Sequence, residues 1–344
     1  MNEGLTLLVK THAFGDALMC TPAVRTLMEK KEGRYLVLAG PSSAPVWERI
    51  PGTEGIYVAP IPPGGPEGGL RLLKWTLANR KRFRKVKRSL VFQGSPSVRR
   101  WVRFLTGARM VSCGGKPLGD WERVVPMEPG DPAGKVYAGV AGVDVRRWRP
   151  FFPVRPAEKN WADGLGLYGT LFAVAPGGGR NPRDTVLEKR WSVAGYARVV
   201  EMLLSAGLNV VLLGGEGDRD VARALKAKVG NMVTDLVGKT TWGQAAAVLD
   251  RCRGFLGADS GTAHLATARF VPSVVLFGPS DPDALYPPGL VVPVRGRADC
   301  APCYSNSRFP GCVGSRAFCM ESITPDEVWH AVEMILRTGG DTRR

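Results

Sequence analysis

Short apolar runs that end in turns alternate along this chain with stretches in which apolar residues recur at helical spacing. An apolar run at 5–10 is followed by a turn at 11–16, an amphipathic stretch at 17–31 and a second apolar run at 35–40. Apolar runs of this length are typical of buried strands, whereas a longer stretch with one apolar side is typical of a helix. The order strand, turn, helix, strand predicts the start of a doubly wound parallel sheet.

The same order begins again in the second half of the chain. An apolar run at 171–174 leads into a turn at 175–179, a helix at 192–206 and another apolar run at 209–213. Between the halves, 144–165 has no sustained periodicity and is predicted to link two domains. We therefore predict an α/β protein with two Rossmann-like, doubly wound parallel-sheet domains. The predicted boundaries are 1–155 and 156–324 for the domains and 325–344 for a C-terminal helix and tail.

The most informative segment is 257–265, Gly-Ala-Asp-Ser-Gly-Thr-Ala-His-Leu, which lies between an apolar run and a helical stretch. The N–H groups and the positive dipole end of a helix that starts there suit a diphosphate. Asp259 and His264 add groups that can bond a sugar or a ribose. A second apolar run at 274–277 ends in Gly-Pro-Ser-Asp-Pro. The two motifs together predict a nucleotide-sugar site.

Composition narrows the class of protein. The 344 residues are 44% hydrophobic and 23% charged, as in an ordinary globular protein. No apolar run approaches the roughly 20 residues of a membrane span, and the N-terminus lacks the basic start of a signal peptide, so we expect a cytoplasmic protein. The net charge of +16 favours a nucleic acid, an anionic membrane surface or a phosphorylated substrate, although a solvated basic surface gives the same charge.

Nine segments, in this order and spacing, resemble glycosyltransferase family 9. That family contains the ADP-heptose:lipopolysaccharide heptosyltransferases. Each motif is weak alone, and the resemblance depends on their common register over most of the chain. The segments are Phe14–Ala17, Thr21–Ala23, Gln93–Gly94, Ala175–Gly177, Lys189–Trp191, Leu212–Gly215, Asp235–Thr240, Asp259–His264 and Phe277–Pro282.

The resemblance implies a GT-B fold whose two domains face a cleft, with the acceptor on the N-terminal domain and the nucleotide sugar on the C-terminal one. It implies an inverting transfer without a catalytic metal or other cofactor. The donor favoured is ADP-heptose, and the acceptor is a lipid-linked or other saccharide, as in lipopolysaccharide core assembly. The implied site residues are Asp16 as catalytic base, Gly177, Lys189, Asp235, Asp259, Ser260, Gly261, Thr262 and His264 for the donor, and Gln93 and Arg99 for the acceptor.

Each of these residues also has a purely structural interpretation. Asp16 could cap the helix that follows it. His264 could be a satisfied core histidine, and Lys189 a surface lysine before a buried tryptophan. Asp235 suits a ribose contact and a turn cap equally well.

Four cysteines lie close together near the C-terminal end. A tetrahedral zinc site needs this number of ligands, but their spacings are not those of a common zinc module. In a cytosolic protein, reduced packing thiols are favoured over a structural zinc or disulfides. The four are Cys300, Cys303, Cys312 and Cys319.

The segment 71–88 is densely basic and has an apolar side. This pattern is typical of an amphipathic helix that docks on an anionic membrane surface, with Trp75 and Phe83 as the residues expected to insert. Trp101, among several arginines, adds to the case for an anionic partner. The alternative is a nucleic-acid-binding protein that uses 71–103. Nucleic acid is the less favoured partner because the chain has no helix-turn-helix, RNA-recognition or zinc-finger signature.

Overall fold

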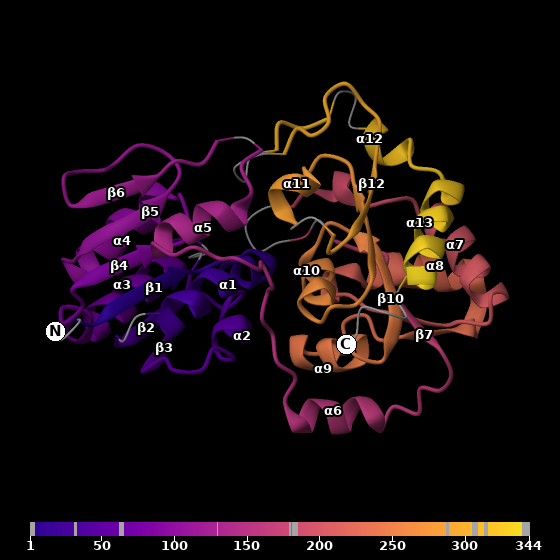
Figure 1. The fold of residues 1–344 in the computed structure, drawn as a ribbon, viewed down its shortest axis with the longest axis horizontal. Helices are drawn as coiled ribbons and strands as arrows, with labels where there is room; N and C mark the ends of the chain where they lie inside the picture. The colour runs from indigo at the N-terminus through magenta and orange to yellow at the C-terminus, as the bar shows by residue number, and fades with distance from the viewer. Residues whose placement is uncertain are drawn as a thin grey trace. The chain divides into compact units, whose positions relative to one another are not determined.

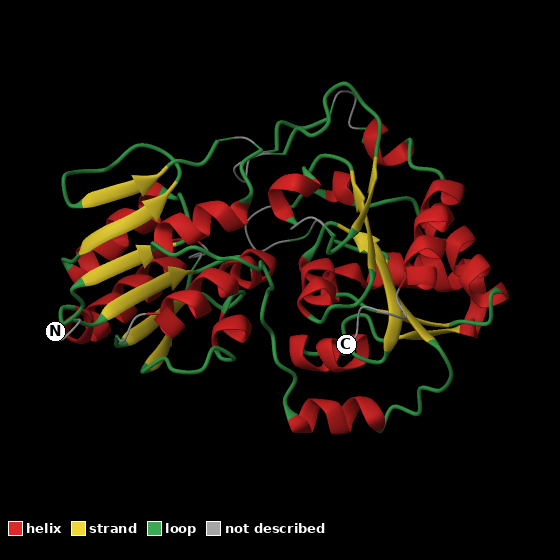
Figure 2. Ribbon diagram, in the orientation of Figure 1, coloured by secondary structure: helices red, strands yellow, loops and turns green. Residues whose placement is uncertain are grey.

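A computed structural model describes residues 4–30, 33–61, 65–128, 130–178, 180, 185–286, 289–304, 309–312 and 316–338 (Figure 1). The chain divides into two compact units, Met1–Phe151 and Phe152–Arg344. Each unit is built around a parallel sheet (Figure 2). Among the described residues, no helix is both long enough and apolar enough to cross a bilayer.

The first unit contains a six-stranded sheet in the order β3-β2-β1-β4-β5-β6, and all neighbouring strands pair in parallel. Its strands are β1 (Thr6–Lys10), β2 (Tyr35–Ala39), β3 (Gly55–Val58), β4 (Arg88–Val91), β5 (Arg109–Cys113) and β6 (Glu122–Val125). Its helices are α1 (Phe14–Lys30), α2 (Ala44–Trp47), α3 (Gly65–Phe83), α4 (Pro96–Thr106) and α5 (Ala133–Ala141).

The helices of this unit cover both faces of the sheet. Right-handed crossovers give this arrangement when the strand order reverses, as it does here between β1 and β4. Helix α1 packs against α2 and α5, whereas α3 packs against α4. Buried residues of α3 and α4, such as Phe83 and Val102, share one core with Leu7 and Val9 of β1. The central strands are apolar on both faces because helices cover both, which is why they appear in the sequence as continuous apolar runs.

The second unit repeats this plan with a sheet in the order β12-β11-β10-β7-β8-β9, again parallel throughout. Its strands are β7 (Leu171–Ala175), β8 (Asn209–Leu212), β9 (Val233–Asp235), β10 (Cys252–Ala258), β11 (Ser273–Phe277) and β12 (Val292–Arg295). Its helices are α6 (Pro156–Asp163), α7 (Val193–Ser205), α8 (Arg219–Val229), α9 (Trp242–Leu249), α10 (Gly261–Ala268), α11 (Pro282–Leu285), α12 (Phe318–Glu321) and α13 (Pro325–Thr338). Three 3₁₀ turns lie at Leu187–Lys189, Glu216–Asp218 and Gly230–Met232.

The terminal helix α13 is part of the second unit. It packs against α7 and the sheet, and its Val328 and Val332 are buried in the same core as Phe172 of β7. The stretch predicted to be a link contains α6, which packs against α9 within the second unit. Residues 339–344 of the predicted tail lie outside the described residues.

Both sheets have a topological switch point, where the strand order reverses. In the first unit it lies between β1 and β4, and in the second between β7 and β10. Chain segments leave the carboxyl ends of these strands in opposite directions, which opens a crevice at that edge of the sheet. Ligands of open α/β sheets bind in this crevice.

Candidate functional site

Two glycine and acid motifs meet at the switch point of the second unit. Gly177 and Gly178 follow β7, while Asp259 and Ser260 follow the neighbouring strand β10. Gly178 has a φ of +115°, and a Cβ placed on it would lie 3.4 Å from Cβ of Ser260. The glycine turn therefore passes directly beside the N-terminus of α10.

Asp218 and Arg190 hold this glycine turn in place. One Asp218 oxygen accepts hydrogen bonds from the Gly178 N–H and the Arg190 guanidinium, each at 2.9 Å. Arg190 also donates to the Gly178 carbonyl oxygen at 2.9 Å. A Cβ on Gly177 would overlap the Asp218 carboxyl group, so only glycine fits there without a shift. Gly177 thus has a packing role that its motif did not reveal.

Asp259 is the centre of the buried polar cluster in this unit. Its side chain is 6% exposed and accepts hydrogen bonds from Lys189 Nζ at 2.7 Å and Ser280 Oγ at 2.8 Å. Tyr286 donates to the other oxygen at 3.3 Å. Burial alone would raise the pKa of Asp259, but the charge of Lys189, that of His264 and these hydrogen bonds lower the pKa to about 2. The carboxylate is ionised at neutral pH.

Aromatic rings surround this ion pair. The His264 ring stacks on Tyr286 with centroids 4.4 Å apart and planes 3° from parallel, and its Nε2 lies 3.7 Å from Asp259 Oδ1. Lys189 Nζ lies 4.4 Å from the centroid of the Tyr304 ring. The cation is thus held between a carboxylate and an aromatic face at one edge of the crevice.

Helix α10 begins beside this pair. Its N-cap is Ser260, whose Oγ accepts from the Ala263 N–H at 3.4 Å. Gly261 and Thr262 form the first turn, and Thr262 is buried. A lysine ammonium and a helix N-terminus on one crevice supply the two kinds of positive charge that a diphosphate needs. Of the predicted donor residues, the structure brings together Gly177, Lys189, Asp259, Ser260, Gly261, Thr262 and His264.

Asp235 has a different local role. It ends β9, and its Oδ1 accepts from the Val237 N–H at 3.0 Å, which closes a turn. Its other oxygen lies 3.7 Å from Lys239 Nζ. Of the two interpretations given to Asp235, the turn cap is the one for which the structure has the hydrogen bond.

In the first unit, Asp16 lies at the switch point and pairs with Lys10. Helix α1 begins at Phe14, so Asp16 belongs to its first turn rather than to the preceding loop. Lys10 Nζ donates to Asp16 Oδ2 at 2.9 Å and to the Tyr137 hydroxyl at 3.3 Å. Burial lowers the pKa of Lys10, but the charge and hydrogen bond of Asp16, together with Tyr137 and Cys20, outweigh it, and the net pKa is raised. Lys10 is 4% exposed and Asp16 36%, so the carboxylate is the member of the pair that faces outward.

Gln93 reaches the same switch point from the end of β4. Its Oε1 accepts from the Thr11 N–H at 2.8 Å and the Thr11 hydroxyl at 3.2 Å. Because the Thr11 N–H can only donate, the Gln93 side-chain atom that faces it is the amide oxygen. The Gln93 Nε2 is buried and has no hydrogen-bond partner among the described residues.

Arg99 does not lie where the acceptor prediction requires it. Its side chain is 1% exposed and forms an ion pair with the buried Glu122 at 3.0 Å, with further bonds to Ser112 Oγ and the Lys116 carbonyl oxygen. A buried arginine with these partners joins α4 to β5 and β6. The assignment of Arg99 to the acceptor is therefore corrected to a structural role.

The four clustered cysteines are free thiols in this structure. Burial first, and then the neighbouring thiols Cys300, Cys312 and Cys319, raise the pKa of Cys303. In the described part of the chain, no three His, Cys, Asp or Glu side chains are placed to hold a metal ion.

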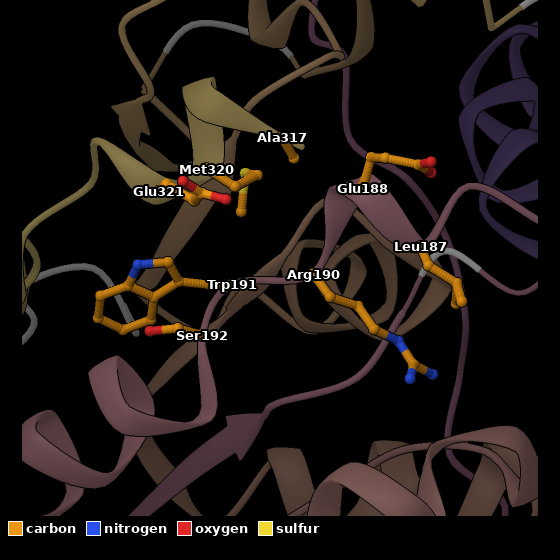
Figure 3. Close-up of a pocket in the computed structure, with 8 residues that line it drawn as sticks. All are labelled: Leu187, Glu188, Arg190, Trp191, Ser192, Ala317, Met320 and Glu321. Carbon is orange, nitrogen blue, oxygen red and sulfur yellow. The ribbon is translucent and has the colours of Figure 1, made fainter. Parts of the chain in front are cut away.

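A separate pocket of about 370 Å³ opens beside the 3₁₀ turn that carries Lys189. Neither Lys189 nor Asp259 lines it. Figure 3 shows the Arg190 side chain extending away from the Trp191 ring, toward the opposite side of the pocket. The lining residues are Leu187, Glu188, Arg190, Trp191, Ser192, Ala317, Met320 and Glu321. The pocket therefore adjoins the Lys189 segment without being the ion-pair site.

The sequence analysis missed several partners of the predicted residues. Ser280 and Arg190 lie within quoted motifs, so the sequence places them near the site. It does not predict which residues they contact. Lys10 ends the first apolar run, where a charged residue at a strand terminus was the available signal. Tyr137, Asp218 and Tyr286 left no signal, because their contacts depend on how distant segments pack.

Comparison with known proteins finds a family model that matches part of the second unit. Residues 179–308 match the sequence model of glycosyltransferase family 9 (heptosyltransferase). Lipooligosaccharide heptosyltransferase 2 of Haemophilus influenzae is 29% identical over 150 residues, which are 40% of this chain and 42% of that protein. The matched part of the chain thus spans less than half the length of this curated relative.

Solved structures resemble the whole chain. The Escherichia coli ADP-heptose lipopolysaccharide heptosyltransferase II matches with a TM-score of 0.74 and 21% identity, over 99% of this chain and 100% of that one. A family 9 glycosyltransferase of Veillonella parvula gives a TM-score of 0.78 and 18% identity, over 98% of each chain. The likeness establishes the fold: the two units are the Rossmann-like domains of a GT-B protein.

Proposed function

We propose that this chain transfers a sugar from a nucleotide diphosphate donor to a saccharide acceptor, as the match of residues 179–308 to the model of glycosyltransferase family 9 supports. The second unit binds the donor and the first unit binds the acceptor. The observation that carries the proposal is the pairing of Lys189 with the buried Asp259, at 2.7 Å, beside the N-terminus of α10.

This arrangement suits the charge that develops when a nucleoside diphosphate leaves. As the bond between the sugar C1 and the phosphate oxygen breaks, negative charge grows on the diphosphate. The ammonium of Lys189 and the N–H groups at the start of α10 stabilise that charge. The ion pair with Asp259 holds the Lys189 ammonium in place. Because protein cations fill this role, the transfer proposed needs neither a divalent metal nor another cofactor.

Asp16 is the proposed base. It accepts the proton of an acceptor hydroxyl while the hydroxyl oxygen bonds to C1 and the diphosphate departs from the opposite side, which inverts the anomeric configuration. The Lys10 ammonium donates a hydrogen bond to Asp16, and the Tyr137 hydroxyl in turn accepts one from Lys10. Gln93 lies nearby with a buried amide N–H group that an acceptor oxygen can bond.

The favoured donor is ADP-heptose, and the favoured acceptor is a lipid-linked saccharide of the lipopolysaccharide core. The resemblance of the motifs supports this choice, as does the likeness to the Escherichia coli protein whose name carries that donor. The cytoplasmic location expected from the sequence belongs to the same proposal.

A donor panel followed by a product assay tests the function. Thermal unfolding of the chain is measured with ADP-, UDP-, GDP- and dTDP-sugars, and ligand binding to the folded state should raise the transition temperature for ADP-heptose alone. ADP-heptose is then incubated with a lipid-linked core acceptor, and the product is detected by mass spectrometry and its anomeric configuration by NMR. If a sugar of another nucleotide in the panel stabilised the chain selectively, that nucleotide sugar would be assigned as the donor. A product with retained anomeric configuration would refute the inverting mechanism.

A further inference from the structure

Helix α3 carries a stripe of leucines that faces solvent. The side chains of Leu70, Leu73 and Leu77 are 53%, 50% and 57% exposed. Their spacing of three and four residues places them on one side of the helix. Exposed leucines that occur singly are common, but three on one helix face form an apolar surface that calls for a partner.

The aromatic residues expected to insert in a membrane lie on the other side of α3. Phe83 is fully buried, with its ring centroid 5.1 Å from that of Tyr57 and 6.0 Å from that of Trp75. Trp75 in turn lies 6.0 Å from Trp101, which donates to the Thr76 hydroxyl. These rings attach α3 to α4 and the sheet. The prediction that Phe83 and Trp75 insert is therefore wrong, and the leucines take their place.

Basic residues surround the leucine stripe. Lys74 and Lys81 follow Leu70 and Leu77 by four residues each, so both lie on the leucine face, and both are exposed. Neither has an ion-pair partner among the described residues. Toward α4, the Arg80 guanidinium lies 4.4 Å from the centroid of the Phe104 ring, which is itself 47% exposed. The face combines aliphatic side chains with a border of positive charge.

We propose that this face of α3, defined by Leu70, Leu73, Leu77, Lys74 and Lys81, docks the first unit on an anionic lipid surface. Aliphatic side chains enter the boundary between headgroups and acyl chains, while the lysines remain at the level of the anionic headgroups. A nucleic acid explains the charge but not the leucines, because bases stack on aromatic rings, and the rings of α3 itself, Trp75 and Phe83, pack against the core. The inference does not rest on the donor site, which lies in the other unit.

Vesicle sedimentation of the full chain tests the surface. The vesicles contain phosphatidylglycerol mixed with phosphatidylcholine, and vesicles of phosphatidylcholine alone are the lipid control. Each basic residue at an anionic surface strengthens binding about fivefold, so Lys74→Glu with Lys81→Glu should weaken it by about 25-fold or more. The matched control is Arg223→Glu with Lys228→Glu on α8, which changes the net charge equally and should retain binding.

A second set of variants separates insertion from charge. Replacing Leu70, Leu73 and Leu77 by serine should weaken vesicle binding at least tenfold without changing the thermal unfolding of the chain, because these side chains are already half exposed. The control replaces three exposed apolar residues of the second unit by serine, at Met232, Phe318 and Met334.

Four outcomes would overturn the proposal. The first is that the wild-type chain ignores the anionic vesicles at low salt. The second is that the leucine variant binds them as well as the wild type does. The third is that the leucine variant abolishes a dimer seen by analytical ultracentrifugation, which would assign the face to a second copy of the chain. A salt-sensitive gel shift with an oligonucleotide that anionic vesicles fail to compete away would assign the charge to nucleic acid instead.

Discussion

Replacing Lys189 by methionine should expose how strongly the donor crevice depends on its ion pair. Methionine keeps much of the volume of the lysine side chain and removes its charge. Asp259, at 6% exposure, then keeps only Ser280, Tyr286 and His264 as polar neighbours. A buried carboxylate that loses its cation is among the costly single changes in a protein.

The magnitude follows from the pKa of Asp259. An aspartate in an unfolded chain has a pKa of about 3.9, and Asp259 in the folded chain has a pKa of about 2. A pKa lowered on folding contributes stability that is present above the unfolded value and is lost as pH falls toward the folded one. The difference is worth about 2–3 kcal/mol at neutral pH. Without Lys189, burial dominates and the pKa of Asp259 should rise. The loss of unfolding free energy in the variant should therefore be largest at neutral pH and shrink as the pH falls through that raised pKa.

The assay is chemical denaturation of the full chain between about pH 7 and about pH 4. The expected result is a loss of about 2–3 kcal/mol of unfolding free energy at neutral pH, in the transition of the second unit. Lys228→Met on α8 is the matched control, since Lys228 is exposed and far from the crevice in the fold. Equal unfolding curves for wild type and Lys189→Met at neutral pH would refute the buried ion pair.

Four further predictions concern other parts of the account. Asp16→Asn should lower turnover by about 10²–10⁴-fold and leave the dissociation constant of the donor nearly unchanged, and near-normal turnover would make Asp16 structural. Arg99→Met, which strands the buried Glu122, should cost about 3–5 kcal/mol of unfolding free energy in the first unit, and a loss below 1 kcal/mol would contradict the buried pair. Gly177→Ala should push Asp218 away and weaken binding of a nucleoside diphosphate measured by calorimetry, whereas unchanged affinity would show that the glycine turn adapts. Transfer should continue in excess chelator, and activity lost to chelator and restored by Mg²⁺ or Mn²⁺ would contradict the metal-free mechanism.

The central strands of the fold could be predicted from the sequence because their apolar runs match their burial on both faces of the sheet. The strands β1, β2, β7 and β8 are continuous apolar runs, as expected for strands covered on both faces. The helix predicted at 192–206 is observed as α7, whose N-cap Ser192 accepts from the Gly195 N–H at 3.0 Å. The edge strands β3 and β6 have four residues each and are partly exposed, and their sequences gave no comparable signal.

The candidate site was predictable as a set of positions but not as a set of contacts. Backbone order alone places the segments after β7 and β10 side by side, so their motifs had to meet. The direction of a long side chain is not fixed in this way. Arg99 lies on the amphipathic helix α4, and only the packing of β6 beside β5 provides Glu122 as its buried partner. The leucine face of α3 was missed for the same reason, since the sequence does not say which of its two apolar faces packs inward.

Calorimetric titration of ADP into the full chain tests the central claim most directly. The claim predicts saturable binding to the wild type that Lys189→Ala weakens at least about tenfold, a change of about 1.4 kcal/mol, while Lys228→Ala binds as the wild type does. UDP, GDP and dTDP should bind more weakly than ADP. If none of these nucleotides binds, or if Lys189→Ala binds ADP with unchanged affinity, the crevice beside α10 is not the site of a nucleotide diphosphate.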